Sequence, residues 1–239
     1  MNSQLQKLCN LSRFTNVANN KKYKIFQSPN KNFKPYNLNI WVVRSDEQHA
    51  GKFDDVLCLF YTDKNRISRF HTYSVTADPS DLSLLKMNNK LGVAIIKPGQ
   101  YLGSHVFGKH KNSYPALVQN KPITVIRDYN KDTILDVTLN SYFRKHEYKD
   151  GNSTVVDYYD ADNKLIFREH TGIFGINIHR ASAYKILESV GLYSEGCVVF
   201  QDPKEYQKFI DIIQLSIPYY NNSFTLTLIT ENQLISSNY

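Results

Sequence analysis

Short stretches rich in β-branched and aromatic residues, each bounded by polar turns, recur along the chain and predict strands. The expected strands are Leu38–Arg44, Val56–Tyr61, Phe70–Thr76, Gly92–Lys97, Gln100–His105, Ala116–Gln119, Ile123–Arg127, Thr154–Tyr159 and Lys164–Glu169. The last two predict a hairpin that turns through residues 160–163. Lys97-Pro98-Gly99-Gln100 fits a type II turn, with Pro second and Gly third. The pattern is typical of a mainly β fold.

Two or three short helices are expected beside these strands. A short apolar stretch, Leu82–Met87, predicts one or two helical turns, and Ser182–Val190 predicts a helix that ends at Gly191. Pro203–Leu215 gives the clearest pattern, because Asp202 can cap it, Pro203 suits the first position and Glu205 can complete a capping box. Its apolar residues follow helical spacing and predict a face packed on a core: Tyr206, Phe209, Ile210 and Ile213.

The sequence predicts one domain preceded by an N-terminal arm. Residues 1–35 are polar and rich in Asn and Lys, with turn signals at Ser28-Pro29-Asn30 and Lys34-Pro35, and predict an extended N-terminal arm. Residues 36–239 then predict a single β-rich domain.

Composition narrows the possible functions. The 239 residues are 41% hydrophobic, which is enough for a core and argues against wholesale disorder. No run of about 18 apolar residues occurs, so no membrane span is expected, and the N-terminus lacks the apolar stretch of a secretory signal. Three widely separated cysteines, Cys9, Cys58 and Cys197, argue against a disulfide framework and favour a reducing compartment.

The net charge of +7 raises the question of an anionic partner. The basic residues are scattered among acids, and the densest clusters are only residues 21–24 and 109–111. Nucleic acid is therefore not the expected partner. A basic surface attracted to an anionic polymer such as a cell wall fits the charge better.

The residues that predict chemistry lie between Gly175 and Phe200. An apolar strand leads to His179, and Cys197 follows a Ser-x-Gly turn and begins another apolar strand. A cysteine nucleophile needs a neighbouring base, because a free thiol titrates near about 8.5. A His and a Cys on adjacent strands can supply that pair, and Gly196 permits close approach of a substrate carbonyl to backbone amides.

At these residues the chain resembles the catalytic motif of the L,D-transpeptidases, in which a His is followed, after a gap of similar length, by Ser/Thr-His-Gly-Cys. The resemblance implies a β-sandwich or barrel of that family and a cofactor-free acyl transfer on peptidoglycan stem peptides. It implies Cys197 as nucleophile, His179 as general base, and Gly196 with Ser194 as the oxyanion loop. Glu195 stands where the family has a second His, and Val199 where a polar residue usually follows.

The same resemblance extends to binding and location. Arg180, with Asn177 beside it, would contact a substrate group such as a stem carboxylate. Residues 93–101 together with 175–180 resemble a divergent branch often encoded by bacteriophages. This implies a location in the virion or the host cytoplasm, with other virion proteins or a second copy of the chain as possible partners. The alternative function is a structural virion or tail component that keeps the fold as a binding or assembly module without activity.

Two metal sites were weighed as alternatives. A zinc site would combine His179 and Cys197 with His170 or His71, although no close ligand pair precedes it. Oxygen-bearing residues at Asp128, Asn130, Asp132 and Asp136 resemble a calcium-loop spacing, but Thr133 replaces the usual Gly and Leu139 the final Glu. An ordinary Asp/Asn-rich turn is therefore expected, in which solvent exposure or cations such as Arg127 and Lys131 offset the repulsion.

Overall fold

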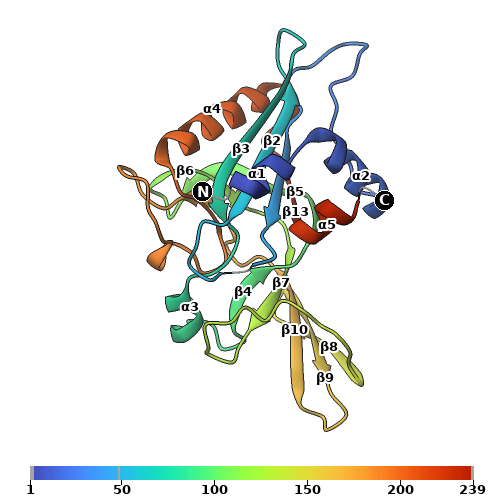
Figure 1. Ribbon diagram of the computed structural model, residues 1–239, viewed down its shortest axis with the longest axis vertical. Coiled ribbons are helices and arrows are strands. Elements are labelled where there is room, and N and C mark those ends of the chain that lie inside the picture. Colours follow the sequence, from blue (N-terminus) through green and yellow to red (C-terminus); the bar gives the residue numbers. More distant parts are fainter. Residues whose placement is uncertain (1–2, 48, 238–239) are drawn as a thin grey trace.

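A closed barrel forms the larger part of the protein in the computed structural model, which describes residues 3–47 and 49–237 (Figure 1). Eight strands close it in the order β1-β13-β5-β6-β11-β12-β3-β2. Their bounds are β1 (Asn39–Arg44), β2 (Asp55–Thr62), β3 (Ser68–Thr76), β5 (Gly99–His110), β6 (Tyr114–Gln119), β11 (Ile178–Arg180), β12 (Val198–Phe200) and β13 (Phe224–Thr230). The prediction of a β-rich barrel or sandwich is confirmed.

A second sheet of five strands lies below the barrel in Figure 1. Its order is β4-β7-β10-β9-β8, with bounds β4 (Val93–Ile96), β7 (Ile123–Asp128), β10 (Leu165–Gly172), β9 (Ser153–Tyr159) and β8 (Arg144–Asp150). The expected hairpin is confirmed as β9 and β10, which pair antiparallel across a turn at residues 160–163.

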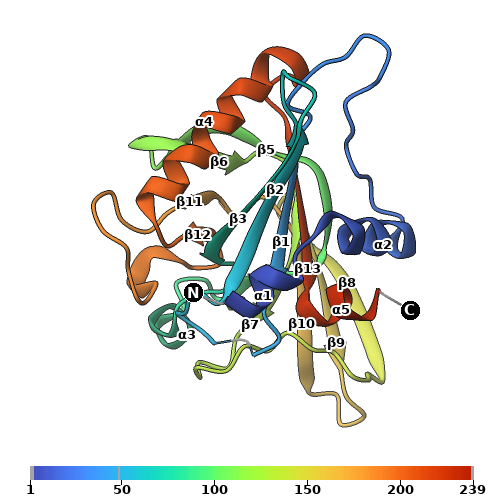
Figure 2. The ribbon, with the colours of Figure 1, turned by 45° about the horizontal axis from the view of Figure 1, so that its top comes forward.

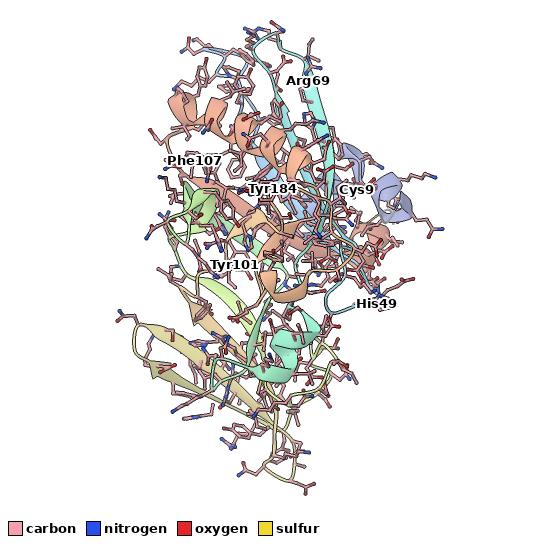
Figure 3. All side chains as sticks on the ribbon, turned by 90° about the vertical axis from the view of Figure 1, so that its left-hand side faces the viewer. Cys9, His49, Arg69, Tyr101, Phe107 and Tyr184 are labelled. Atoms are coloured by element: carbon pink, nitrogen blue, oxygen red, sulfur yellow. The ribbon has the colours of Figure 1, made fainter. Side chains whose placement is uncertain are left out.

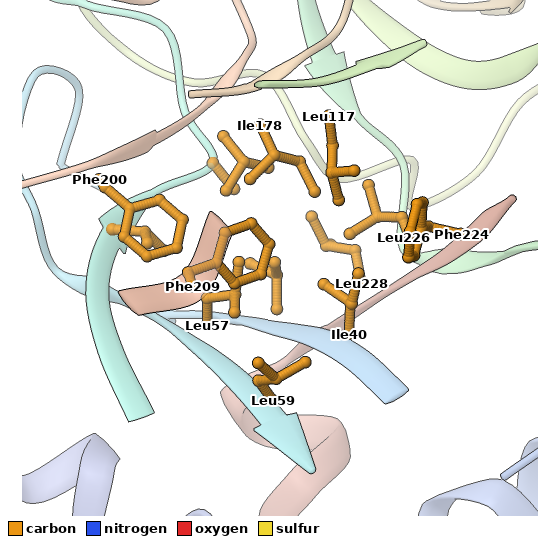
Figure 4. Packing of buried hydrophobic residues seen from close by; sticks show 14 of the residues in the cluster. Ile40, Leu57, Leu59, Leu117, Ile178, Phe200, Phe209, Phe224, Leu226 and Leu228 are labelled. Carbon is orange, nitrogen blue, oxygen red and sulfur yellow. The ribbon is translucent and has the colours of Figure 1, made fainter. Parts of the chain in front are cut away.

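The barrel interior is filled by alternate side chains of its strands. The core residues Leu57 and Leu59 of β2, Ile40 of β1 and Leu228 of β13 come from neighbouring strands of the barrel wall (Figure 4). Helix α4 (Pro203–Tyr220) packs on this core and contributes Phe209. Its predicted buried face is confirmed, and Asp202 caps it by accepting the Lys204 N–H. Glu205 is paired with Lys208.

The remaining helices lie outside the barrel. Helices α1 (Ser3–Leu8), α2 (Leu11–Lys21) and α5 (Glu231–Ser236) cover the outer face of β1, β2 and β13 (Figure 2). There Phe14 of α2 packs on Trp41 with ring centroids 5.0 Å apart. The extended arm predicted for residues 1–35 is therefore wrong over α1 and α2, because Phe14, Val17 and Ala18 form a buried helical face.

Two other local predictions are wrong. Residues 182–190 form an irregular loop, so the helix predicted over Ser182–Val190 is wrong. The helical turns predicted over Leu82–Met87 are confirmed as α3 (Asp81–Lys86). Gly99 is not among the glycines with positive φ, which a type II turn would require. The segment at Pro98 instead carries the chain from β4 in one sheet to β5 in the other.

The barrel and the second sheet are joined by buried polar contacts. Tyr101 of β5, labelled in Figure 3, lies with its hydroxyl 3.0 Å from the Thr124 carbonyl of β7. The buried Arg44 donates to the carbonyls of Ile96 and Ala77 and pairs with Asp78 at 2.8 Å. These contacts fix the position of β4 and β7 relative to the barrel.

Candidate functional site

Adjacent parallel strands bring His179 and Cys197 to the same face of the barrel wall. In the register of β11 and β12, Ile178 pairs with Val198 and His179 with Val199. Ile178 and Val198 lie in the barrel core. Because side chains alternate along a strand, His179 and Cys197 point to the outer side as diagonal neighbours.

The hydrogen bonds of His179 define which ring nitrogen is available. The side chain is 2% exposed, and Nδ1 lies 2.9 Å from the Arg180 carbonyl oxygen and 3.1 Å from the Tyr114 hydroxyl. A carbonyl oxygen only accepts, so the proton belongs on Nδ1. Nε2 has no hydrogen-bond partner among the described residues. The lone pair of Nε2 is therefore free to take a proton.

Cys197 is a partly exposed free thiol. Its Sγ accepts the Asn177 N–H at 3.4 Å and lies 3.5 Å from the Gly175 carbonyl oxygen. Desolvation raises the pKa of Cys197 to about 11, although the Asn177 N–H and the charge of Lys111 oppose it. Desolvation, with the neighbouring His110, lowers the pKa of His179 to about 4. At neutral pH the resting pair is thus an uncharged thiol and an uncharged imidazole.

The loop before Cys197 is held by Ser194 and Gly196. The buried Ser194 hydroxyl accepts the Gly196 N–H at 3.2 Å and lies 2.9 Å from the Asp78 carbonyl oxygen. Gly196 has φ +117°, and a Cβ there would lie 2.1 Å from the Ala94 carbonyl oxygen of β4. Only glycine fits this position.

These hydrogen bonds show which backbone N–H groups of the loop already have an acceptor. Since the Gly196 N–H is engaged by Ser194, it does not point to a substrate. The Cys197 N–H has no acceptor among the described residues. The Cys197 N–H is therefore available to a carbonyl oxygen.

Asn177 connects the site to a second histidine. Its Oδ1 accepts the Gln119 N–H, which fixes the amide so that Nδ2 donates to His110 Nδ1 at 3.1 Å. The His110 ring stacks on His179 with centroids 4.1 Å apart. Asn177 therefore acts on the pair through His110 as well as through its own backbone N–H.

The other predicted site residues have different surroundings. The Arg180 guanidinium lies over the Tyr114 ring at 4.5 Å and is not part of the cavity wall. Val199 is buried against Phe53 and Val190. Glu195 lines the cavity and accepts a hydrogen bond from Asn88.

A cavity of about 710 Å³ gives access to the pair. Barrel residues and second-sheet residues both line it, including His179, Cys197, Lys111, Glu195, Phe174 and Arg127. Its volume is in the usual range for a small-ligand or peptide site. Sequence spacing did not reveal four residues as parts of the site: His110, Lys111, Tyr114 and Arg127. Strand pairing brings them there, and the hydrogen-bonded partners in this region are 43 to 67 residues apart in the sequence.

The structure does not assemble the zinc alternative. Among the described residues, no group of three or more His, Cys, Asp or Glu side chains is placed to hold a metal ion. His71 stacks on Tyr61 and Tyr73 of the barrel. His170 is bonded to Ser153 and Arg127.

The Asp-rich segment forms a turn closed by its own hydrogen bonds. Asn130 donates to Asp136, Asp132 accepts the Ile134 N–H, and Asp128 accepts the Asp136 N–H at 3.1 Å. Asp128 is buried, and desolvation raises its pKa to about 6. The expected compensation by Arg127 is wrong, because that guanidinium bonds His170 and Gly92 instead. Asp132 and Asp136 remain partly exposed, so solvent screens their repulsion, as expected from the sequence.

Within residues 3–47 and 49–237, no helix has the length and apolar character needed to cross a membrane. Comparisons of the chain with models of protein families, with curated proteins and with solved structures found no match.

Proposed function

We propose that the protein is a cysteine-nucleophile acyl-transfer enzyme of the L,D-transpeptidase type, acting on peptidoglycan stem peptides. The observation that carries the proposal is the state of His179: Nδ1 is held by the Arg180 carbonyl, and Nε2 is unpartnered beside the cavity that Cys197 lines. A histidine in this state is an available general base.

The proposed reaction begins with a neutral pair. The Cys197 thiol passes its proton to His179 Nε2 as Sγ forms a bond with the peptide carbonyl carbon. The Cys197 N–H donates to the carbonyl oxygen as it becomes an oxyanion. The carbon–nitrogen bond then breaks, and the leaving amine takes the proton from Nε2. Water or an acceptor amine next attacks the thioester and returns the thiol, giving hydrolysis or transfer.

The raised pKa of Cys197 and the lowered pKa of His179 both oppose proton transfer in the resting pair. A thiol with a pKa of about 11 is almost fully protonated at pH 7, so the proton must move as the substrate binds or reacts. Lys111 and the Asn177 N–H both favour the thiolate. They would stabilise the charge at the moment it forms.

Reaction with stem peptides tests the proposal. Muropeptides incubated with the unaltered chain should change mass by acyl transfer or hydrolysis, and a thioester at Cys197 should be trapped on acid quenching. Cys197→Ala should abolish both, and His179→Ala should slow turnover by roughly 10²–10⁴-fold. His71→Ala, a histidine remote from the cavity, is the matched control and should retain activity. Absence of both reaction and thioester in the unaltered chain would refute the proposal.

A second candidate, a virion or tail component without activity, is favoured by one observation. The loop at residues 182–190 exposes apolar side chains, with Tyr184 96% exposed (Figure 3). Exposed apolar residues of this kind are typical of protein contacts. A bacteriophage origin, in the virion or the host cytoplasm, is compatible with either function. If muropeptides stay unchanged and Tyr184→Ser impairs incorporation into particles, this second candidate replaces the first.

A further inference from the structure

Arg127, near the end of β7, is a buried guanidinium without a carboxylate partner. It is 3% exposed. Nε donates to His170 Nδ1 at 3.2 Å and Nη1 to the Gly92 carbonyl at 3.1 Å, and both acceptors are uncharged. Nη2 is buried with no acceptor among the described residues. None of the ion pairs in the described part of the chain includes Arg127.

Other arginines show how the protein usually treats a buried guanidinium. Arg44 is paired with Asp78 at 2.8 Å, and Arg168 with Asp157 at 2.5 Å. A buried charge without a counter-ion is costly, because it loses water and gains no ionic partner. Burial and the nearby Arg168 lower the pKa of Arg127 to about 10, against the opposing charge of Asp150, which forms no ion pair with it, so Arg127 stays charged at neutral pH. An anion from outside the chain would provide the missing partner.

The position of Arg127 indicates that the anion belongs to the ligand that reacts at Cys197. It lines the same cavity as Cys197, and its guanidinium lies 4.6 Å from the centre of the Phe174 ring. Phe174 directly precedes Gly175, whose carbonyl oxygen lies 3.5 Å from Cys197 Sγ. One short wall segment therefore separates the cation from the nucleophile. A ligand whose acyl group lies at Cys197 can place a second group at Arg127.

The other charges on the cavity wall strengthen this assignment. Lys111 adds a second cation, and Glu195 is the only carboxylate among the described lining residues. Glu195 acts on Cys197, raising its pKa, and is bonded to Asn88. The wall is thus positive overall. An acidic group of the ligand is therefore favoured at Arg127.

We propose that Arg127 forms a carboxylate-binding subsite, which holds an acidic group of the ligand that reacts at Cys197 and selects acidic over neutral peptides. That the ligand is a stem peptide rests on the proposed function. The need for an anion rests on Arg127 itself.

Two thiol reagents test the subsite without any peptide. The dianionic dithiobisnitrobenzoate and the neutral dithiodipyridine both form mixed disulfides with Cys197 and release a coloured thiol. The ratio of their rate constants, anionic over neutral, should fall about tenfold or more in Arg127→Gln and only partly in Arg127→Lys. Arg168→Gln, in the same sheet, is the matched control and should keep the ratio. Cys197→Ala gives the background from Cys9 and Cys58.

A peptide pair then tests the choice of ligand. Calorimetry on Cys197→Ala protein should show roughly tenfold tighter binding of a stem tetrapeptide with a free terminal carboxylate than of its amide, and Arg127→Gln should erase the difference. If Arg127→Gln fails to fold, two other measurements replace it: the reagent ratio in Arg127→Lys, and the salt dependence of that ratio in the unaltered chain. If the ratio changes neither with Arg127→Lys nor with salt, the proposed subsite is overturned. Acyl transfer with no dependence on Arg127 in either assay leaves the function and removes the subsite. If reagent selectivity depends on Arg127 but no acyl transfer occurs, the subsite stands and the proposed function is refuted.

Discussion

The barrel and the five-stranded sheet both line one cavity but are built in different ways. Every barrel strand is paired on both sides, and its interior is filled by one large apolar cluster, which also takes in Ile96 and Val125 of the sheet. The sheet is open, with β4 and β8 as its edges, and its apolar cluster is small. β8 is exposed along nearly its whole length. Its many charged residues discourage pairing with another strand.

This difference matches the division of labour proposed for the site. His179 and Cys197 come from barrel strands, where closure and close packing hold the distance between base and nucleophile. Arg127 comes from β7, an inner strand of the open sheet that pairs with both β4 and β10. The barrel carries the bond-making groups, and the sheet carries the ligand-selecting group.

Core truncations in the two regions should reveal their unequal contributions to stability. Phe209 and Phe167 are both buried, the first in the barrel core and the second in the small cluster of the sheet. We expect Phe209→Ala to lower the free energy of unfolding by about 4 kcal/mol and Phe167→Ala by about 2 kcal/mol, since the smaller cluster can collapse more easily. Urea unfolding measures both. Equal losses would show that the sheet is packed as firmly as the barrel.

The contact between the two regions should be sensitive to one methyl group. Gly196→Ala places a Cβ against the Ala94 backbone and forces alanine into φ +117°. We expect a loss of about 3 kcal/mol in the free energy of unfolding and a displaced Cys197. Gly151→Ala is the control, because Gly151 also has positive φ but nothing within 4 Å. It should cost about 1 kcal/mol. A similar cost for both would mean that Gly196 is needed only for its backbone angle.

The sequence predicted most strands of both regions and missed one in each, β13 in the barrel and β8 in the sheet. Barrel strands such as β1 and β2 are buried and read as apolar runs, and α4 carries both a cap and a periodic face. β8 is charged and exposed, so no alternation marks it. β13 carries an alternating pattern typical of a strand, Phe-Thr-Leu-Thr-Leu, which the strand predictions do not include. Helix α2 also had a readable signal, with Asn10 as its cap.

The site was predictable only in part. The Ser-x-Gly turn and the two apolar strands located His179 and Cys197, and the structure places those two side chains on one wall. The stacked His110 and the unpaired Arg127 depend on strand register and burial, which no local spacing encodes. The helix expected over 182–190 failed because its exposed side chains, such as Tyr184 and Ile186, have no core to pack on.

The smallest expected effect concerns Asp128, at the end of the sheet strand that carries Arg127. Its folded-state pKa of about 6 lies above the ordinary value of 3.8, because burial disfavours the carboxylate. The folded protein therefore binds this proton more tightly than the unfolded chain, and stability falls as pH rises from about 4 to 6. We expect Asp128→Asn to raise the free energy of unfolding by about 1 kcal/mol at pH 7, allowing for solvent screening, and by nothing at pH 3.5. The Asn oxygen can still accept the Asp136 N–H. Urea unfolding at the two pH values measures the effect, with Asp162→Asn, an exposed carboxyl in the turn between β9 and β10, as the control that should bring no gain at pH 7. A loss of stability in Asp128→Asn at pH 7 would instead show that the carboxylate is ionised and stabilising there.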